Sequence, residues 1–389
     1  MTTLPFLRRL ERSTSSAVLA AAVSFAVAAT LAVTAAPAAA ADLEYGKPGE
    51  PVQLVVGYQP FYAESWSGVV IRGKKLYEKY LPKGSTVEFS VGLQGAVIVN
   101  AMVAGKQHIG YLGDMPAIVS TTKEQVADIR IVGAIGLGQD QCNVFLTRTD
   151  APAFATAEDG VKWLDGKRVA VPLGSCADRF AQAVFRKQKI KPESYLNQNI
   201  EVITSNFRAG KIDGAVIWEP TASRLVHEGL AKRVASGATV GESDGAFITM
   251  RADLIRQRPD IVRAWLNAEL DAELFIADPK NSTEVAALAA QYATGFPEKS
   301  LWSALYGKHP AAEGGTPVRL TLPFGITPDV SALIAADTAF LFSIKSVTSE
   351  KLRPEAVMPE FTQQILKERG LAAPVGRIAP LDDKDYRGK

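Results

Sequence analysis

Short hydrophobic runs alternate with segments of helical periodicity in the part of the chain that follows residue 50. Residues 52–57 (VQLVVG), 86–92 (TVEFSVG) and 108–112 (HIGYL) have the length and composition of strands. Residues 67–81 and 95–106, which lie between them, carry apolar side chains at the spacing of a helix. Strands that alternate with helices favour parallel sheets covered on both faces, so this region predicts a β-α-β-α-β unit of an α/β protein.

A second stretch follows the same plan. We interpret it as a strand at 167–172, a helix at 177–188, a strand at 199–205, a helical turn at 206–211 and a strand at 213–218. The segments AGKQHIGYLGD (104–114) and AGKIDGAVIWE (209–219) align without a gap, and each ends on a carboxylate at the end of a strand. The pattern indicates two related halves, although two common helix-to-strand turns would match in the same way by coincidence.

The chain passes between the two halves twice. Residues 138–152 begin polar and become strand-like, and residues 238–251 have the pattern of a return crossing. Two crossings form a hinge about which lobes close. We therefore expect a lobe 1 of residues 42–141 and 245–389 and a lobe 2 of residues 142–244. Lobe 1 then carries a C-terminal helical extension, with helices expected at 258–279, 282–294, 298–306 and 328–345.

The first 41 residues have the pattern of a secretory signal peptide. Three arginines precede an Ala/Val-rich stretch that ends in small residues before Asp42. An uncleaved membrane anchor is the alternative, because the apolar run is long enough to span a bilayer. Without residues 1–40, which hold three arginines and one glutamate, Lys+Arg falls from 43 to 40 and Asp+Glu from 41 to 40. A neutral exported protein is not a general nucleic-acid or anionic-membrane binder, and we expect it in the periplasm.

Cysteine and histidine are scarce, and their spacing predicts no metal site. Cys142 and Cys176 form a disulfide in an oxidising compartment or are two small buried hydrophobes, and spacing alone does not decide between these. His108, His227 and His309 are scattered, so we interpret each as structural or surface. The chain has no GxSxG, HExxH or P-loop motif, and GAIGLG (133–138) lacks the spacing of a dinucleotide fingerprint.

Five blocks carry a resemblance to a known family. They are VVGYQ, NAMVAGKQHIGYLGDMPA, LDGKRVAVPLGS, AGKIDGAVIWEP and LPFGIT, in this order. The chain resembles the periplasmic solute-binding proteins of ABC importers, in the nitrate, sulfonate and taurine group. The resemblance covers residues 42 to about 370. It implies a type II two-lobe periplasmic-binding-protein fold, with a mainly parallel sheet flanked by helices in each lobe. It also implies a monomer without catalysis or cofactor that delivers a small solute to a membrane permease and its ATPase.

Candidate ligand-binding residues lie in the loops that follow the strands, because open α/β sheets bind ligands at their carboxyl ends. They are Gln59, Phe61, Tyr62, Gln94, Gly95, Asp114, Gln141, Gly174, Ser175, Cys176, Trp218 and Glu219. The turn at Gly174 and Ser175 opens a helix whose N-terminal amides suit a sulfonate, carboxylate or nitrate. Ser175 is alternatively a helix cap alone. Trp218 stacks on a ligand or packs within its own lobe, and Glu219 binds ligand or braces the loop.

The acidic residues near these loops bear on the ligand. If two of Asp114, Asp140 and Glu219 point into the cleft, a bare anion is disfavoured and a zwitterion such as taurine fits better. Arg179 and Arg208 are candidate anion partners, but we place both on helix surfaces. We predict a small organic anion or zwitterion, sulfonate- or taurine-like, or nitrate. The alternatives are a binder of a thiamine-precursor pyrimidine, which the wider group includes, and an exported enzyme that uses the same cleft.

Overall fold

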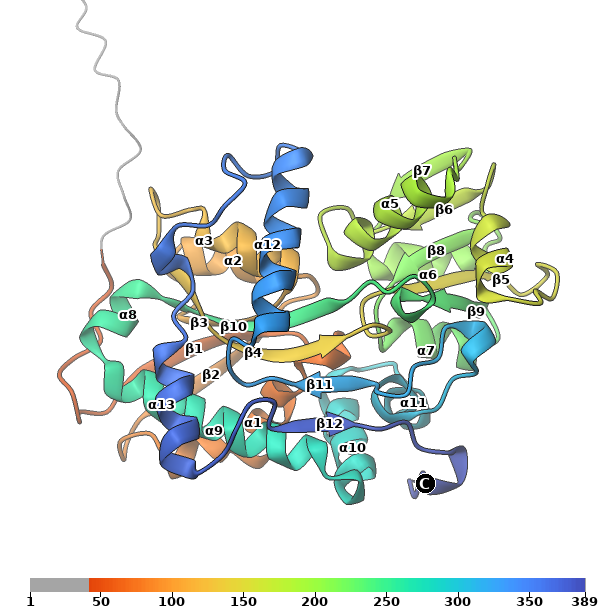
Figure 1. The fold of residues 1–389 in the computed structure, drawn as a ribbon. Coiled ribbons are helices and arrows are strands. Elements are labelled where there is room, and N and C mark those ends of the chain that lie inside the picture. The colour runs from red at the N-terminus through yellow and green to blue at the C-terminus, as the bar shows by residue number, and fades with distance from the viewer. Residues whose placement is uncertain (1–41, 389) are drawn as a thin grey trace, which may run out of the picture. The chain divides into compact units, whose positions relative to one another are not determined.

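The computed structural model describes residues 42–388, and the predicted signal peptide of residues 1–41 lies outside this part of the chain. The described residues form two β-sheets (Figure 1). The first sheet contains β1 (Gln53–Tyr58), β2 (Thr86–Val91), β3 (Ile109–Gly113), β4 (Ile129–Gly138), β10 (Asp244–Arg251), β11 (Leu320–Leu322) and β12 (Gly376–Ile378), in the order β12-β11-β4-β10-β3-β1-β2. The second contains β5 (Val144–Arg148), β6 (Arg168–Val171), β7 (Ser194–Asn197), β8 (Gly214–Ile217) and β9 (Ala231–Ser236), in the order β7-β6-β8-β5-β9.

Each sheet is the centre of one lobe, and helices flank it. Lobe 1, built on the seven-stranded sheet, carries α1 (Ser67–Lys74), α2 (Gly95–Val103), α3 (Asp114–Thr121), α8 (Ala252–Gln257), α9 (Pro259–Ala277), α10 (Ser282–Tyr292), α11 (Glu298–Tyr306), α12 (Pro328–Ser343) and α13 (Glu360–Arg369). Lobe 2, built on the five-stranded sheet, carries α4 (Ala157–Lys162), α5 (Cys176–Gln188), α6 (Ile200–Arg208) and α7 (Thr221–His227). The predicted two-lobe α/β fold is therefore confirmed, and so is the helical C-terminal extension.

Both sheets are mixed, and the prediction of mainly parallel sheets is wrong in this respect. β1 runs parallel to β2 and β3, but β10 is antiparallel to β3 and β4. In lobe 2, β6 is parallel to β7 and β8, but β5 is antiparallel to β8 and β9. The crossings explain the reversal. The chain leaves lobe 1 along β4 and returns along β10, so these neighbours must run in opposite directions.

One predicted strand is a helix. Residues 199–205 were expected to be extended, but residues 200–208 form α6, and the strand of this region is β7 at 194–197. The Asn199 side chain accepts hydrogen bonds from the Glu201 and Val202 amides at 3.1 and 2.9 Å, which is an N-cap. The buried side chains of Ile200, Ile203 and Phe207 are spaced as one face of a helix. The cap and this spacing outweigh the β-branched composition.

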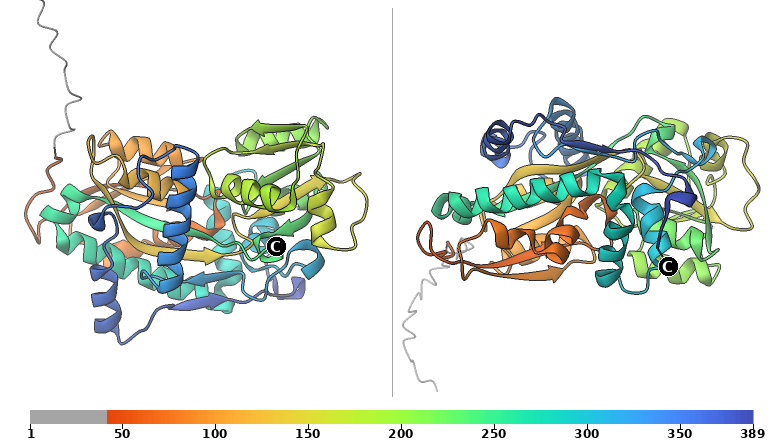
Figure 2. Two further views of the ribbon diagram at one scale, coloured as in Figure 1. Left: turned by 45° about the horizontal axis from the view of Figure 1, so that its top comes forward. Right: turned by 90° about the horizontal axis from the view of Figure 1, so that it is seen from below.

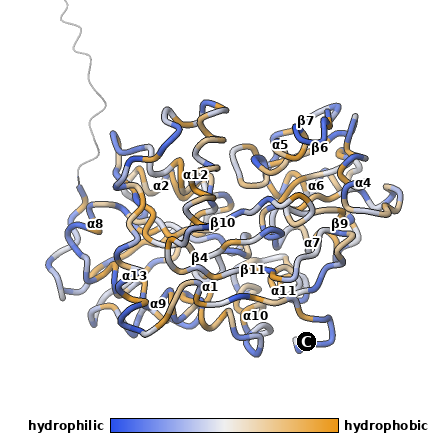
Figure 3. Tube along the Cα trace, in the orientation of Figure 1, coloured by the Kyte–Doolittle hydropathy of each residue, from blue (hydrophilic) through white to orange (hydrophobic). Residues whose placement is uncertain are grey.

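The core of lobe 1 lies on both faces of its sheet. On one face, α2, α3 and α12 cover the sheet, with Ile98, Ile118 and Phe247 fully buried between them. On the other face α1 packs along α9, whose Trp265 is fully buried. The two additional views separate these layers (Figure 2), and hydrophilic segments gather at the peripheral loops (Figure 3). None of the helices within residues 42–388 combines the length and apolar character that a bilayer-crossing helix needs.

The two crossings and α11 connect the lobes. Residues 139–143 join β4 to β5, and residues 237–243 join β9 to β10. In addition, α11 packs against α7 of lobe 2. The loops that follow β2, β3 and β6 lead directly into α2, α3 and α5, and the N-termini of these helices line the candidate site.

Candidate functional site

Three helices begin at the cleft between the lobes. In lobe 1, α2 follows its N-cap Gln94, whose side chain accepts no hydrogen bond from the helix, and α3 follows its N-cap Gly113, which has no side chain to accept one. In lobe 2, α5 follows Ser175. The first amides of a helix have no partner within the helix, and the helix dipole places partial positive charge on them. The N-termini of α2 and α5 therefore provide donors and positive potential without a paired lysine or arginine, whereas at α3 the Met115 amide donates to Asp114 and Pro116 has no amide hydrogen.

Two cavities lie at these helix ends. The smaller one holds about 30 Å³ and is lined from both lobes by Gln59, Tyr62, Gly95, Gly113, Pro116, Ser175, Cys176 and Trp218. The larger one holds about 310 Å³ and is lined by Gln94, Gly95, Ala96, Val99, Asn100, Pro116, Val119, Lys123, Pro172, Leu173, Gly174, Ser175, Trp218 and Ser346. The cavities share Gly95, Pro116, Ser175 and Trp218, so we describe them together as the cleft.

Eight of the twelve predicted site residues line the cleft. They are Gln59, Tyr62, Gln94, Gly95, Gly174, Ser175, Cys176 and Trp218. Phe61, Asp114, Gln141 and Glu219 do not line it. The residues that sequence reasoning missed include Gly113, Pro116 and Leu173. Gly113 ends β3, Pro116 lies in the first turn of α3, and Leu173 follows β6, so their position at the ends of buried strands was the available signal.

Phe61 and Trp218 connect the lobes at the edge of the cleft. The Trp218 indole Nε1 donates a hydrogen bond to the Phe61 carbonyl oxygen at 2.9 Å. The Phe61 ring packs on Phe296, with ring centroids 5.5 Å apart. Next to this contact, the Ala63 amide donates to the Glu219 carbonyl oxygen at 2.9 Å. Trp218 thus lines the cleft and also ties lobe 2 to the first loop of lobe 1.

Glu219 braces its loop. Its carboxylate accepts hydrogen bonds from the Ser223 amide and from Arg233 Nη1, both at 2.8 Å, and it is fully buried. Burial raises the pKa of the Glu219 carboxyl group, and the positive charge of Arg233 opposes this shift. The Gln141 amide, also buried, donates to the carbonyl oxygen of Ala304 at 3.3 Å. Both side chains therefore support the crossing.

Asp114 is buried and does not line the cleft. Its carboxylate accepts a hydrogen bond from the Met115 amide at 2.6 Å, and the side chain is fully buried. Burial raises the pKa of Asp114, while the positive charge of Arg179 lowers it. Arg179 was expected on a helix surface, and this prediction is wrong, since the residue is only 6% exposed. The amphipathic face of α5 turns Arg179 toward lobe 1, where buried carboxylates compensate its charge.

Ser175 caps α5 as its spacing indicated. Its hydroxyl accepts a hydrogen bond from the Asp178 amide at 3.3 Å and donates to the Pro172 carbonyl oxygen at 2.6 Å. The Asp178 carboxylate accepts from the Gly174 amide at 2.9 Å and from the Tyr195 hydroxyl at 2.7 Å. Gly174 has φ of +74°, a conformation that favours glycine. The turn therefore presents the α5 amides to the cleft while its own side chains are occupied.

Cys142 and Cys176 form a disulfide, with their Cα atoms 5.9 Å apart. This separation lies in the usual range for a disulfide, and the alternative of two unlinked buried residues is wrong. Cys142 lies in the first crossing and Cys176 is the first residue of α5. The bond therefore attaches one wall of the cleft to the hinge.

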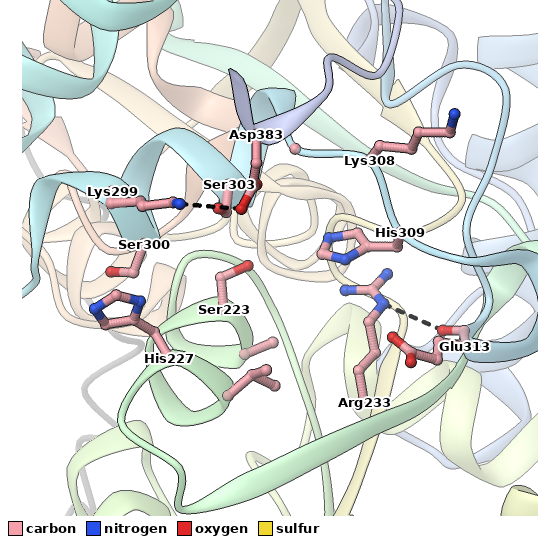
Figure 4. A pocket seen from close by; sticks show the side chains of 13 residues that line it. Ser223, His227, Arg233, Lys299, Ser300, Ser303, Lys308, His309, Glu313 and Asp383 are labelled. Atoms are coloured by element: carbon pink, nitrogen blue, oxygen red, sulfur yellow. Dashed lines mark hydrogen bonds and ion pairs between the residues drawn. The ribbon is translucent and has the colours of Figure 1, made fainter. Parts of the chain in front are cut away.

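A further cavity, of about 270 Å³, lies between α7 and β9 of lobe 2 and α11 and the chain end of lobe 1. Ser223, His227, Arg233 and His309 point toward it (Figure 4). Its charges are largely paired, since Lys299 contacts Asp383 at 3.0 Å and Arg233 contacts Glu219. Burial holds the pKa of His309 well below its ordinary value, so that this ring is neutral at pH 7. The cavity shares no lining residue with the cleft.

Comparison with known proteins identifies the family. The NMT1-like family matches residues 47–290, which is more than half of the chain. The chain belongs to the NMT1-like family. A curated relative is the taurine-binding periplasmic protein of Escherichia coli (strain K12), which is 27% identical over 228 residues. That alignment covers 55% of this chain and 66% of the relative, slightly under two thirds of its length.

Solved structures show the same fold. The alkanesulfonate-binding protein SsuA from Xanthomonas axonopodis pv. citri, bound to MOPS, matches with a TM-score of 0.62 at 20% identity, covering 80% of this chain and 99% of that chain. The periplasmic nitrate-binding protein NrtA from Synechocystis PCC 6803 matches with a TM-score of 0.62 at 14% identity, covering 83% and 90%. The resemblance to the nitrate, sulfonate and taurine group is thereby confirmed for family and fold.

Proposed function

We propose that this protein is the exported solute-binding component of an ABC importer. In this account a small organic anion or zwitterion, sulfonate- or taurine-like, or nitrate, binds between lobe 1 (42–141 and 245–389) and lobe 2 (142–244). The closed form then delivers the solute unchanged to a membrane permease and its ATPase. The protein acts as a monomer in the periplasm and needs no cofactor.

The observation that carries the proposal is the meeting of α2, α3 and α5 at one cleft. An anionic head group that accepts hydrogen bonds from the first amides of α2 and α5 contacts both lobes at once. Such a solute binds the closed form better than the open form, and this difference in affinity shifts the population toward closure. The Trp218 ring provides an apolar surface in the same cleft for an aliphatic tail.

Several features bear on the choice of solute. Neither Asp114 nor Glu219 lines the cleft, and the buried Glu219 carboxylate is paired with Arg233, so no carboxylate of these two contacts a solute there. Lys123 is exposed at the rim of the larger cavity and adds positive charge. These features support an anionic head group over a bare cation. The relative's name and the solved neighbours make taurine and short alkanesulfonates the first solutes to test.

A thermal-shift and calorimetric panel tests the proposal. Purified protein is titrated with taurine, C2 to C6 alkanesulfonates, nitrate and a hydroxymethylpyrimidine. We expect a rise in Tm and a saturable heat with at least one of the anions. A response to the pyrimidine alone would contradict the anion assignment, and turnover of any of these solutes would contradict pure binding.

A further inference from the structure

Arg179 joins the lobes through buried ion pairs. It lies on α5 of lobe 2, and its Nε is 2.9 Å from Asp337 Oδ1 on α12 of lobe 1. Its Nη1 donates to Glu242 in the second crossing at 3.1 Å, and its Nη2 donates to the Ser243 carbonyl oxygen. Arg179 is 6% exposed and Asp337 is fully buried. One side chain of lobe 2 is therefore held by both the helical extension and the hinge.

The arginine faces more carboxylates than it can neutralise. Four buried carboxylates form a cluster beside it, on the seven-stranded sheet and its helices. Asp337 on α12, Asp114 on α3 and Asp244 on β10 act on the charge of Arg179, and Glu64, in the 3-10 turn at 63–65, adjoins Asp244 and Asp114. All four are at most 2% exposed. Glu64 Oε1, Asp114 Oδ2, Asp244 Oδ1 and both Asp337 oxygens accept no hydrogen bond from the described residues. The other charged and titratable groups at this boundary are Tyr62, Glu242 and Asp140. Tyr62 donates to Glu64, Glu242 pairs with Arg179, and Asp140 pairs with Arg319 and Arg233.

We propose that Arg179 and these four carboxylates form a proton-dependent latch between the lobes, which favours the closed form before a solute arrives. Arg179 is a positioning residue in this proposal, because it lines neither cavity of the cleft. The proposal rests on the proposed function in one respect, namely that the lobes open and close around a solute.

A cluster of four buried carboxylates beside one cation requires protons. Asp337 contacts Arg179, and the Asp114 carboxylate acts on both Arg179 and Asp337. Like charges buried together disfavour ionisation of both groups, so one of the two carboxyl groups holds a proton. Burial raises the pKa of Asp337 well above its ordinary value, and the Asp114 carboxylate raises it further. Burial also raises the pKa of Glu64 well above its ordinary value, and that of Asp244 to about 7. In the proposed latch, opening withdraws α5 and lets water reach these carboxylates, and the loss of their burial outweighs the loss of Arg179, which lowers their pKa in the closed form. The closed form then binds protons that the open form releases.

The direction of the pH effect follows from these shifts. A carboxyl group whose pKa is higher in the closed form favours closure fully below its ordinary pKa, about 4. That contribution declines as the pH rises through the raised value, which is about 7 for Asp244. We therefore expect the closed form to lose population as the pH rises from about 5 to about 8. The Tyr62 ring lines the cleft and its hydroxyl donates to Glu64, so the latch adjoins the solute site.

Small-angle X-ray scattering of the solute-free protein tests the latch without any solute. The protein is stripped by unfolding, dialysis and refolding, and its radius of gyration is measured from pH 5 to pH 9. The variants are Arg179→Gln, Arg179→Lys and Asp244→Asn. The matched control is Arg256→Gln, because Arg256 pairs with Asp42 at 2.6 Å on the exposed surface of lobe 1.

We expect the radius of gyration of the wild type to rise with pH, and that of R256Q to follow it. R179Q is expected to lower the closed-to-open ratio at pH 6 by about tenfold, the change that 1.4 kcal/mol produces. R179K is expected to lie between R179Q and the wild type, since it keeps the charge and loses the fork geometry. D244N removes the group that titrates near pH 7, so the radius of gyration of this variant is expected to change less with pH in that range.

Any of three results would overturn the latch. They are a wild-type radius of gyration that does not depend on pH, an R179Q curve that coincides with the wild type, and a D244N curve with the wild-type slope. If R179Q does not fold, the D244N profile decides alone. Failure of the protein to bind taurine or any other solute of the panel contradicts the proposed function instead, because the latch is measured without solute.

Discussion

A single added methyl group at Gly113 tests whether the solute occupies the cleft. Gly113 is the N-cap of α3 with φ of −67°, which alanine adopts without strain. The three atoms nearest to a Cβ built there all belong to Tyr62, with Cε1 and Oη at 3.6 Å and Cζ at 3.7 Å, which is ordinary van der Waals contact. The fold therefore tolerates Gly113→Ala. The methyl group projects into a cavity of about 30 Å³, close to the volume of one water molecule.

The expected effect on binding is much larger than the effect on stability. Forcing a solute against one extra methyl group costs about 1–3 kcal/mol, as overpacking does in cores. This corresponds to a rise in Kd of about 5- to 150-fold. The free energy of unfolding changes by at most about 1 kcal/mol, because the entropic gain of Gly→Ala and the loss of a glycine N-cap oppose each other.

Gly325→Ala is the matched control. Its Cβ would meet Thr362 and Leu366 at 3.6 and 3.7 Å, the same kind of contact, but Gly325 lines neither cavity of the cleft. Isothermal titration calorimetry with taurine, or with the panel solute that gives the largest Tm shift, measures Kd for both variants. If G113A binds as tightly as G325A and the wild type, the solute does not lie against Gly113 and the reasoning is wrong.

Three further predictions concern the closing contact, the disulfide and one ion pair. Trp218→Phe keeps an aromatic surface and loses the inter-lobe hydrogen bond to Phe61. Calorimetry is expected to show a Kd raised by a factor of about 2–10, because one hydrogen bond contributes ~0.5–1.5 kcal/mol. An unchanged Kd would argue against this closing contact. Replacing Cys142 and Cys176 together by serine opens a loop with a sequence separation of 34. On the chain-entropy account this lowers the free energy of unfolding, measured in urea, by about 4 kcal/mol. Equal urea midpoints for the variant and the wild type would contradict it. Hydrogen bonds from Arg168 lower the pKa of Asp213 from 3.8 to about 2. This pair therefore stabilises the fold above about pH 4, and its contribution declines as the pH falls toward 2. Urea melts of Asp213→Asn are expected to lack this part of the acid dependence, and an acid profile identical to that of the wild type would refute the prediction.

Much of the fold was predictable because buried strands and amphipathic helices have clear periods. The helices expected at 258–279, 282–294, 298–306 and 328–345 correspond to α9 to α12 within a few residues. The repeated AGK blocks place Gly105 and Gly210 in the same left-handed conformation, with φ of +71° and +65°. The error at 199–205 arose because Ile and Val suit strands as well as buried helix faces. The direction of β10 was not readable, since strand direction depends on which strands pair.

The site was predictable only as loops. Turns after buried strands were visible, and they contain most of the residues that line the cleft. Side-chain direction was not visible, because one residue of displacement reverses the face of a strand end. Asp114 and Glu219 occupy equivalent places in the two copies, yet both side chains are buried on partners outside the cleft, Asp114 on the Met115 amide and Glu219 on Ser223 and Arg233. Arg179 was misplaced for the same reason, since its partner Asp337 lies on a helix more than 150 residues away.

A crystal structure of the protein with taurine tests the central claim most directly. The account predicts sulfonate density between the lobes, within hydrogen-bonding distance of amides in the first turns of α2 and α5, with Trp218 beside the carbon chain. Density in the cavity around Ser223, His227 and His309, or contact with one lobe alone, would contradict it.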